Sequence, residues 1–176
     1  MDSDRQREER LVGELELLGV RYLSRQSTYQ AKSVRSPAAL LADLVRQPSP
    51  RVRAAVIAVL LSRPEYAEAV PAALECLKPD EAFTLRAFYA AAMLLQRQNA
   101  DRLQSLMGHR WRPLPELSEV TEDLNLPSQA TPLEGLTALA QEHQRRSQKT
   151  VNWVGSYEQV SRRLIRSWEL ESQWKR

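Results

Sequence analysis

Cysteine, histidine and glycine are scarce in this sequence, and each scarcity excludes a class of protein. The single cysteine, Cys76, has no partner for an internal disulfide or a CxxC motif, which favours a reducing compartment. The two histidines, His109 and His143, lie in none of the short motifs of metal-dependent or nucleophilic enzymes. Five glycines are too few for the turns of a β-sandwich or barrel, whereas alanine and leucine are abundant, so the composition favours helices.

Long apolar runs and a strong net charge are also missing. The longest apolar runs, such as residues 54–61, are far shorter than the roughly 20 residues that a membrane-spanning helix needs. The first ten residues are charged and lack the apolar segment of a signal peptide. We therefore expect a soluble cytoplasmic protein with no membrane partner. The net charge is only +3, although residues 141–176 hold eight basic and four acidic side chains.

The chain contains enough apolar material to build a core. Hydrophobic residues make up 43% and charged residues 27%, which are ordinary values for a globular protein. A length of 176 residues suits one domain with an appended arm. We interpret residues 1–147 as a helical-repeat-like domain and residues 148–176 as a Trp- and Arg-rich amphipathic helix that caps this domain or binds a partner.

Capping signals divide the chain into helices and predict an all-α fold. Ser36 and Ser49 each precede a proline at the first helical position, and Thr131 and Glu134 form a capping box around Pro132. Asp80 is the expected N-cap of the longest helix. Ser156 is the expected N-cap of the last helix, with Gln159 as its reciprocal capping partner. The predicted helices cover residues 5–18, 37–47, 50–63, 66–77, 81–98, 100–107, 132–146 and 156–174.

Two of these helices repeat each other at an offset of 33 residues. Val52-Arg53-Ala54 corresponds to Leu85-Arg86-Ala87, and each triplet enters an Ala-rich apolar helix. The stretch LLADLVRQPSPRVRAAVIAVLL joins a leucine-rich helix, a proline-containing turn and the Val-Arg-Ala entry, and it resembles a HEAT repeat, an armadillo-type helical repeat. The resemblance covers about residues 37–98. It implies a short stack of helices whose ends must be capped by the flanking helices, because such arrays need about three units.

No set of residues in the sequence forms a recognisable catalytic or metal-binding motif. Cys76 lies beside leucines on a helical pattern and is expected to be a small core residue, and both histidines are expected to be structural. The acidic run at 116–123 lacks the spacing of a calcium loop. We therefore expect a non-enzymatic protein without a metal or a cofactor.

The last helix has one strongly apolar face. At 100° per residue, Tyr157, Val160, Leu164 and Trp168 fall within about 80° of one another, and Ile165 widens the stripe. Burying one large side chain is worth roughly 1.5–3 kcal/mol, so this face must be covered. It could pack on the protein's own core, on a partner protein or on a membrane surface. The membrane is the least favoured of the three, because glutamates dilute the basic face of the helix.

The opposite face of this helix is the expected partner site. Three arginines lie there, together with two apolar residues that are off the stripe, and Trp and Arg are enriched in binding hot spots. A further tryptophan precedes the predicted start of the helix, where it fits a hydrophobic staple. The residues assigned to partner binding are Trp153, Arg162, Arg163, Arg166, Leu170 and Trp174. The favoured function is a protein–protein interaction module, a small bacterial-type subunit or regulator; the sequence leaves the partner and the oligomeric state open.

A polar, basic loop supports an alternative function. Residues 24–36 interleave basic side chains with tyrosine, and aromatic rings among basic residues can stack on bases and bind phosphates. The alternative is a nucleic-acid-binding accessory protein that uses this loop and the arginine face of the last helix. The loop residues assigned to it are Arg25, Tyr29, Lys32 and Arg35.

Overall fold

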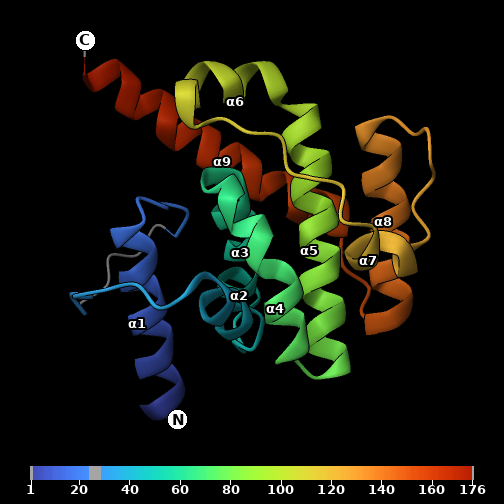
Figure 1. Cartoon of the computed structure of the whole chain (residues 1–176), viewed down its shortest axis with the longest axis horizontal. Coiled ribbons are helices and arrows are strands. Elements are labelled where there is room, and N and C mark those ends of the chain that lie inside the picture. The colour runs from blue at the N-terminus through green and yellow to red at the C-terminus, as the bar shows by residue number, and fades with distance from the viewer. Residues whose placement is uncertain (1, 24–28, 176) are drawn as a thin grey trace.

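The computed structural model describes residues 2–23 and 29–175. This part of the chain contains nine α-helices, three short 3₁₀ helices and no strand, which confirms the all-α fold class (Figure 1). None of the described helices is long and apolar enough to span a membrane. The α-helices are α1 (Asp2–Leu17), α2 (Pro37–Val45), α3 (Pro50–Ser62), α4 (Val70–Glu75), α5 (Pro79–Gln98), α6 (Ala100–Met107), α7 (Ser118–Thr121), α8 (Pro132–Ser147) and α9 (Trp153–Trp174).

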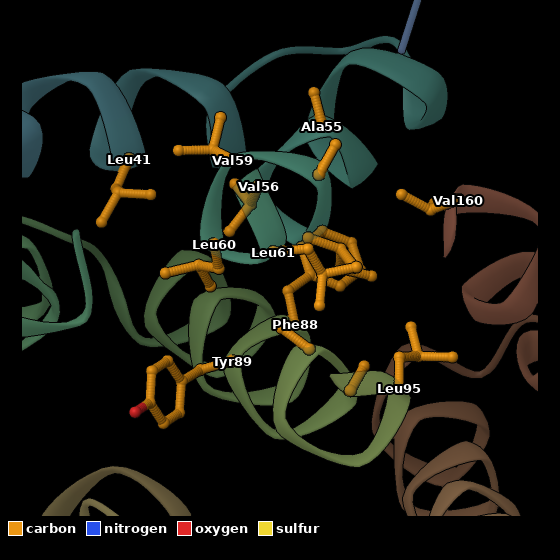
Figure 2. Packing of buried hydrophobic residues seen from close by; sticks show 14 of the residues in the cluster. Leu41, Ala55, Val56, Val59, Leu60, Leu61, Phe88, Tyr89, Leu95 and Val160 are labelled. Carbon is orange, nitrogen blue, oxygen red and sulfur yellow. The ribbon is translucent and has the colours of Figure 1, made fainter. Parts of the chain in front are cut away.

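Helix α3 lies at the centre and is buried on every side. All seven residues from Ala55 to Leu61 have an exposed fraction of 0%. A helix that is apolar all round needs neighbours all round, and α2, α5 and α9 provide them. In Figure 2, Leu41 of α2, Phe88 and Leu95 of α5, and Val160 of α9 surround the apolar residues of α3. Residues from both predicted parts of the chain, 1–147 and 148–176, thus contribute to one core.

The helices form a stack of two successive pairs. Helix α2 packs on α3, and the 3₁₀ turn Pro64–Ala69 with α4 leads into α5, which packs on α3 in turn. The repeated arginines have different partners. Arg53 Nη1 donates to the carbonyl oxygens of Gln47 and Pro48 in the turn before its own helix. Arg86 Nη1 instead donates to Glu119 and Val120, far along the chain. The two arginines therefore do not hold equivalent turns, and the HEAT resemblance stays a prediction.

An extended strap, defined here as residues 111–117, covers the outer side of α5. The strap is held by two buried polar side chains of that helix. Gln96 Nε2 donates to the Arg112 carbonyl oxygen at 2.6 Å, and Gln96 Oε1 accepts from the Leu114 amide at 2.7 Å. The Tyr89 hydroxyl donates to the Pro115 carbonyl oxygen at 2.5 Å. The amide of Gln96 is thus satisfied at both ends, as a buried polar group requires.

Three local predictions are wrong. Helix α9 begins at Trp153, because Asn152 Oδ1 accepts the Gly155 amide at 3.0 Å and caps the helix upstream of Ser156. Helix α5 begins at Pro79, which places Asp80 in the first turn rather than at the N-cap. Cys76 is exposed at the end of α4 and is not a core residue, since the short helix ends before its side chain reaches the interior.

Helix α1 is tied to the start of α2 by a largely buried ion pair. Glu14 is 7% exposed, and its carboxylate accepts from Arg35 Nε at 3.0 Å and from Nη2 at 2.7 Å. Arg35 Nη1 also binds Asp43 of α2. Hydrogen bonding to Glu14 raises the pKa of Arg35 further above its ordinary value. Arg35 therefore joins three segments that are separate in the sequence.

We expect Arg35→Ala to destabilise the fold by about 2–3 kcal/mol, because it leaves the buried Glu14 carboxylate without its counter-charge. Urea unfolding at neutral pH measures the loss. Arg112→Ala is the matched control, since its exposed side chain makes no hydrogen bond or ion pair within the described residues, and it should change stability by less than about 0.5 kcal/mol. Equal midpoints for the two variants would contradict the structural role of Arg35.

Candidate functional site

Helix α9 is fixed to the core through one face. Tyr157, Val160, Leu164 and Ile165 are each about 1% exposed or less, and Trp168 packs half-buried at the edge of the same cluster. These residues recur at helical spacing, so they all point to the same side. The apolar stripe of the last helix thus packs on the protein's own core, in contact with α3, α5, α6 and α8.

The opposite face of α9 presents an exposed row of four residues, Arg163, Arg166, Leu170 and Trp174. Their spacing of three or four residues places them along one side of the helix. Leu170 is 47% exposed and Trp174 is 89% exposed, and both arginines are exposed. Near the chain end in Figure 1, α9 extends beyond the helices that it packs against. Its last turns therefore offer a tryptophan and a leucine to solvent.

The glutamates of α9 are already paired within the protein. Glu169 accepts from Arg102 of α6 at 2.6 Å, and Glu171 lies 3.4 Å from a guanidinium nitrogen of Arg21. Glu158 lies 4.0 Å from Arg162 on the next turn. The two arginines of the exposed row have no such carboxylate among the described residues. The row therefore carries an uncompensated positive charge beside its apolar end.

Trp153 does not belong to the exposed row. It lies at the other end of α9, where its ring stacks on His143 of α8 with centroids 3.6 Å apart and planes 13° apart. His143 Nδ1 is 2.6 Å from the Tyr157 hydroxyl, and Phe83 and Phe88 of α5 meet the imidazole edge-on. These five rings form an aromatic cluster, named so below. The tryptophan expected in a partner surface therefore helps to join α5, α8 and α9.

The imidazole in the aromatic cluster is neutral at pH 7. His143 is 4% exposed, and burial, with a smaller contribution from the charge of Arg53, lowers its pKa to about 4. Burial also raises the pKa of the Tyr157 hydroxyl. Both groups therefore stay uncharged across the physiological range, and one hydrogen bond satisfies both.

A cleft of about 570 Å³ opens beside the aromatic cluster. It lies between the first turns of α3, α5 and α9 and the last turn of α8, with Tyr22 at one side. The cleft is lined by four rings, those of Phe88, His143, Trp153 and Tyr157, and by basic side chains from the C-cap of α2, from α3 and from the segment before α9. Those basic residues are Arg46, Arg51, Arg53 and Lys149.

Only some of the loop residues assigned to nucleic-acid binding are exposed in the structure. Tyr29 is 43% exposed and has Arg10 over its ring, with the guanidinium carbon 5.9 Å from the ring centroid. Lys32 is exposed. Arg35 is committed to Glu14 and Asp43, and Arg25 lies outside the described residues. The structure therefore leaves Tyr29 and Lys32 as the exposed members of this set.

The residues with catalytic potential lie apart from one another. His109 is exposed after α6, whereas His143 is buried in the aromatic cluster and Cys76 is exposed after α4. Within residues 2–23 and 29–175, no three His, Cys, Asp or Glu side chains gather in an arrangement that could hold a metal ion.

No protein-family model matches this chain, and neither the curated proteins nor the solved structures contain a significant match.

Sequence reasoning missed the cleft and the aromatic cluster. The available signal was the spacing of Trp153 and Tyr157, one helical turn apart, shortly after His143. Two helices joined by a short loop pack side by side, which brings these rings together.

We expect the protein to lose stability as the pH falls from about 6.5 to 4. Because the pKa of His143 is lowered in the fold, the unfolded chain binds the proton first, and up to about 3 kcal/mol is lost over that window. Urea unfolding at several pH values measures the slope. The His143→Gln variant should be less stable than the parent protein at pH 7, and its stability should fall less steeply between pH 6.5 and 4. A parent-like slope in His143→Gln would contradict this assignment.

The two tryptophans of the last turns should differ in their effect on stability. Trp168→Ala removes a ring packed against the core, and we expect a loss of about 2–3 kcal/mol, below that of a fully buried aromatic. Trp174→Ala removes a ring that is 89% exposed and should change stability by less than about 0.5 kcal/mol. Thermal melts of both variants measure this difference, and equal melting temperatures would show that Trp174 is part of the cap.

Proposed function

We propose that this protein is a non-catalytic interaction module that binds another protein through the exposed row of α9. The observation that carries the proposal is the 89% exposure of Trp174, next to Leu170 on a helix that is otherwise anchored. Single exposed apolar residues are common on protein surfaces, but a Trp and a Leu one turn apart form a compact apolar patch. Tryptophan is also among the residues most enriched in binding hot spots.

The anchoring of α9 supports a pre-organised binding surface. Four residues of its inner face are almost fully buried, and Glu169 and Glu171 pair with side chains outside the helix. The row is therefore part of a formed helix before any partner arrives. A partner does not have to order this segment, which lowers the entropic cost of association.

The charges of the row indicate the chemistry of the partner. Arg163 and Arg166 carry positive charge without a nearby carboxylate in the described structure, while Leu170 and Trp174 follow on the same side. A row of this kind suits docking of a helix into a groove. The matching partner is a protein with an apolar groove flanked by acidic side chains. A role as a small bacterial-type subunit or regulator fits such a module.

The alternative is a nucleic-acid-binding accessory protein. The outward arginines of α9, with exposed Tyr29 and Lys32, favour it. Phosphate contacts would make the affinity fall steeply with salt, whereas a complex centred on Trp174 and Leu170 should be much less sensitive.

The test is affinity capture from the native host, followed by binding measurements with the purified partner. We expect Trp174→Ala to weaken the affinity by about 30-fold or more, as expected for a hot spot. Arg163→Gln and Arg166→Gln should mainly slow association. Leu133→Ala on α8 is the control, because Leu133 is a similarly exposed apolar residue, 53% exposed, outside the row.

Capture that Trp174→Ala leaves intact would contradict the proposal. Capture that disappears after nuclease treatment or at high salt would instead support the nucleic-acid alternative. Self-association that Trp174→Ala abolishes would show that the row binds a second copy of this chain.

A further inference from the structure

We infer that the cleft beside the aromatic cluster is a binding site for a small organic anion that carries a flat ring. The cleft is at the N-terminal end of α9, whereas Leu170 and Trp174 of the exposed row are at its C-terminal end. The inference does not depend on the proposed protein partner.

The size and lining of the cleft suit a small molecule. Its volume of about 570 Å³ lies within the range of about 300–1,000 Å³ that is usual for ligand sites. Phe88, Trp153 and Tyr157 contribute aromatic surface, and Ala54 and Ile57 of α3 contribute aliphatic surface. Because His143 is neutral at pH 7, the aromatic side of the cleft bears no charge of its own. A planar apolar group can therefore be buried there without meeting an ionised side chain of the cluster.

The basic side chains at the cleft favour an anionic ligand. Arg53 is half-buried, and its guanidinium donates to two backbone carbonyl oxygens but has no carboxylate within ion-pair distance in the described structure. Burial lowers the pKa of Arg53, which reflects a cation partly removed from water. Arg51 and Lys149 are exposed and form no ion pair with the described residues. A buried or partly buried charge is stable when it is paired, and an anionic ligand would supply the partner.

The acidic side chains at the cleft offset only part of this charge. Glu81 accepts the Lys78 amide at 3.0 Å and lies 3.6 Å from Arg46 Nε, so these two charges neutralise each other. Asp80 is the remaining acid of the lining, against Arg51, Arg53 and Lys149.

The N-terminal end of α3 also borders the cleft, since Pro50 and Arg51 line it. The positive end of a helix favours a nearby anion. A ligand that joins an anionic group to a flat ring therefore matches the cations and the aromatic surface of the cleft.

The experiment is an NMR titration of the ¹⁵N-labelled Trp174→Ala protein, in which the exposed row cannot contribute its tryptophan. The probes are 1-naphthalenesulfonate, the neutral 1-naphthalenemethanol and inorganic sulfate. We expect the sulfonate to shift the Trp153 indole signal in a saturable way. The alcohol and sulfate, which each lack one of the two required groups, should bind at least about tenfold more weakly.

Variants locate the charge requirement. Arg51→Gln and Lys149→Gln should each weaken sulfonate binding by about tenfold, whereas Arg110→Gln, an exposed arginine outside the cleft, should leave it unchanged. Arg53 is kept, because its guanidinium holds the turn between α2 and α3.

Three results would each overturn the inference. They are an unmoved Trp153 signal, equal binding of the neutral alcohol or of sulfate, and sulfonate binding that neither cleft variant weakens.

Discussion

The burial of α3 on every side is the constraint on which this structure depends. Helix α3 has thirteen residues and almost no polar side chain beyond its first turn, so it must be surrounded by other apolar surfaces. Helices α2, α5 and α9, from the early, middle and last parts of the sequence, surround it. Helix α9 is part of that enclosure. Its inner face is therefore committed to stability, and only its two ends and its outer face are free to contact other molecules.

The two ends of α9 offer contrasting environments. At the N-terminal end, neutral rings face a cleft with basic side chains, and the polar groups of His143 and Tyr157 satisfy each other. At the C-terminal end, a solvent-exposed ring follows two arginines that have no carboxylate partner among the described residues. The first arrangement suits a small ligand that is largely enclosed, and the second suits a large partner that covers a convex surface. The two proposed sites therefore use different parts of one helix, whose inner face stays packed on the core.

The sequence predicted the helices well because their signals are local. Ser36 and Thr131 cap their helices as expected, and the apolar stripe of α9 is readable from its periodicity. The errors arise where a contact with a distant residue, or a competing capping residue, determines the local structure. Asn152 caps α9 upstream of Ser156. Arg35 is expected from the sequence to be a loop cation but forms a structural ion pair with Glu14, which is 21 residues away in the sequence and therefore outside any local pattern. The cleft forms only when five helices, α2, α3, α5, α8 and α9, lie together, and no local sequence pattern contains that information.

The strap determines which kind of neighbour packs on one side of α5. A neighbouring helix has already used its own amides and carbonyls, so it could not satisfy the side-chain amide of Gln96 at both ends; an extended segment can. Gln96 and Tyr89 thus select a non-helical neighbour for this side of α5. A further helical pair cannot be added there by the packing that joins α3 to α5. On the side that the strap covers, α5 therefore has no helix packed against it through Gln96 and Tyr89.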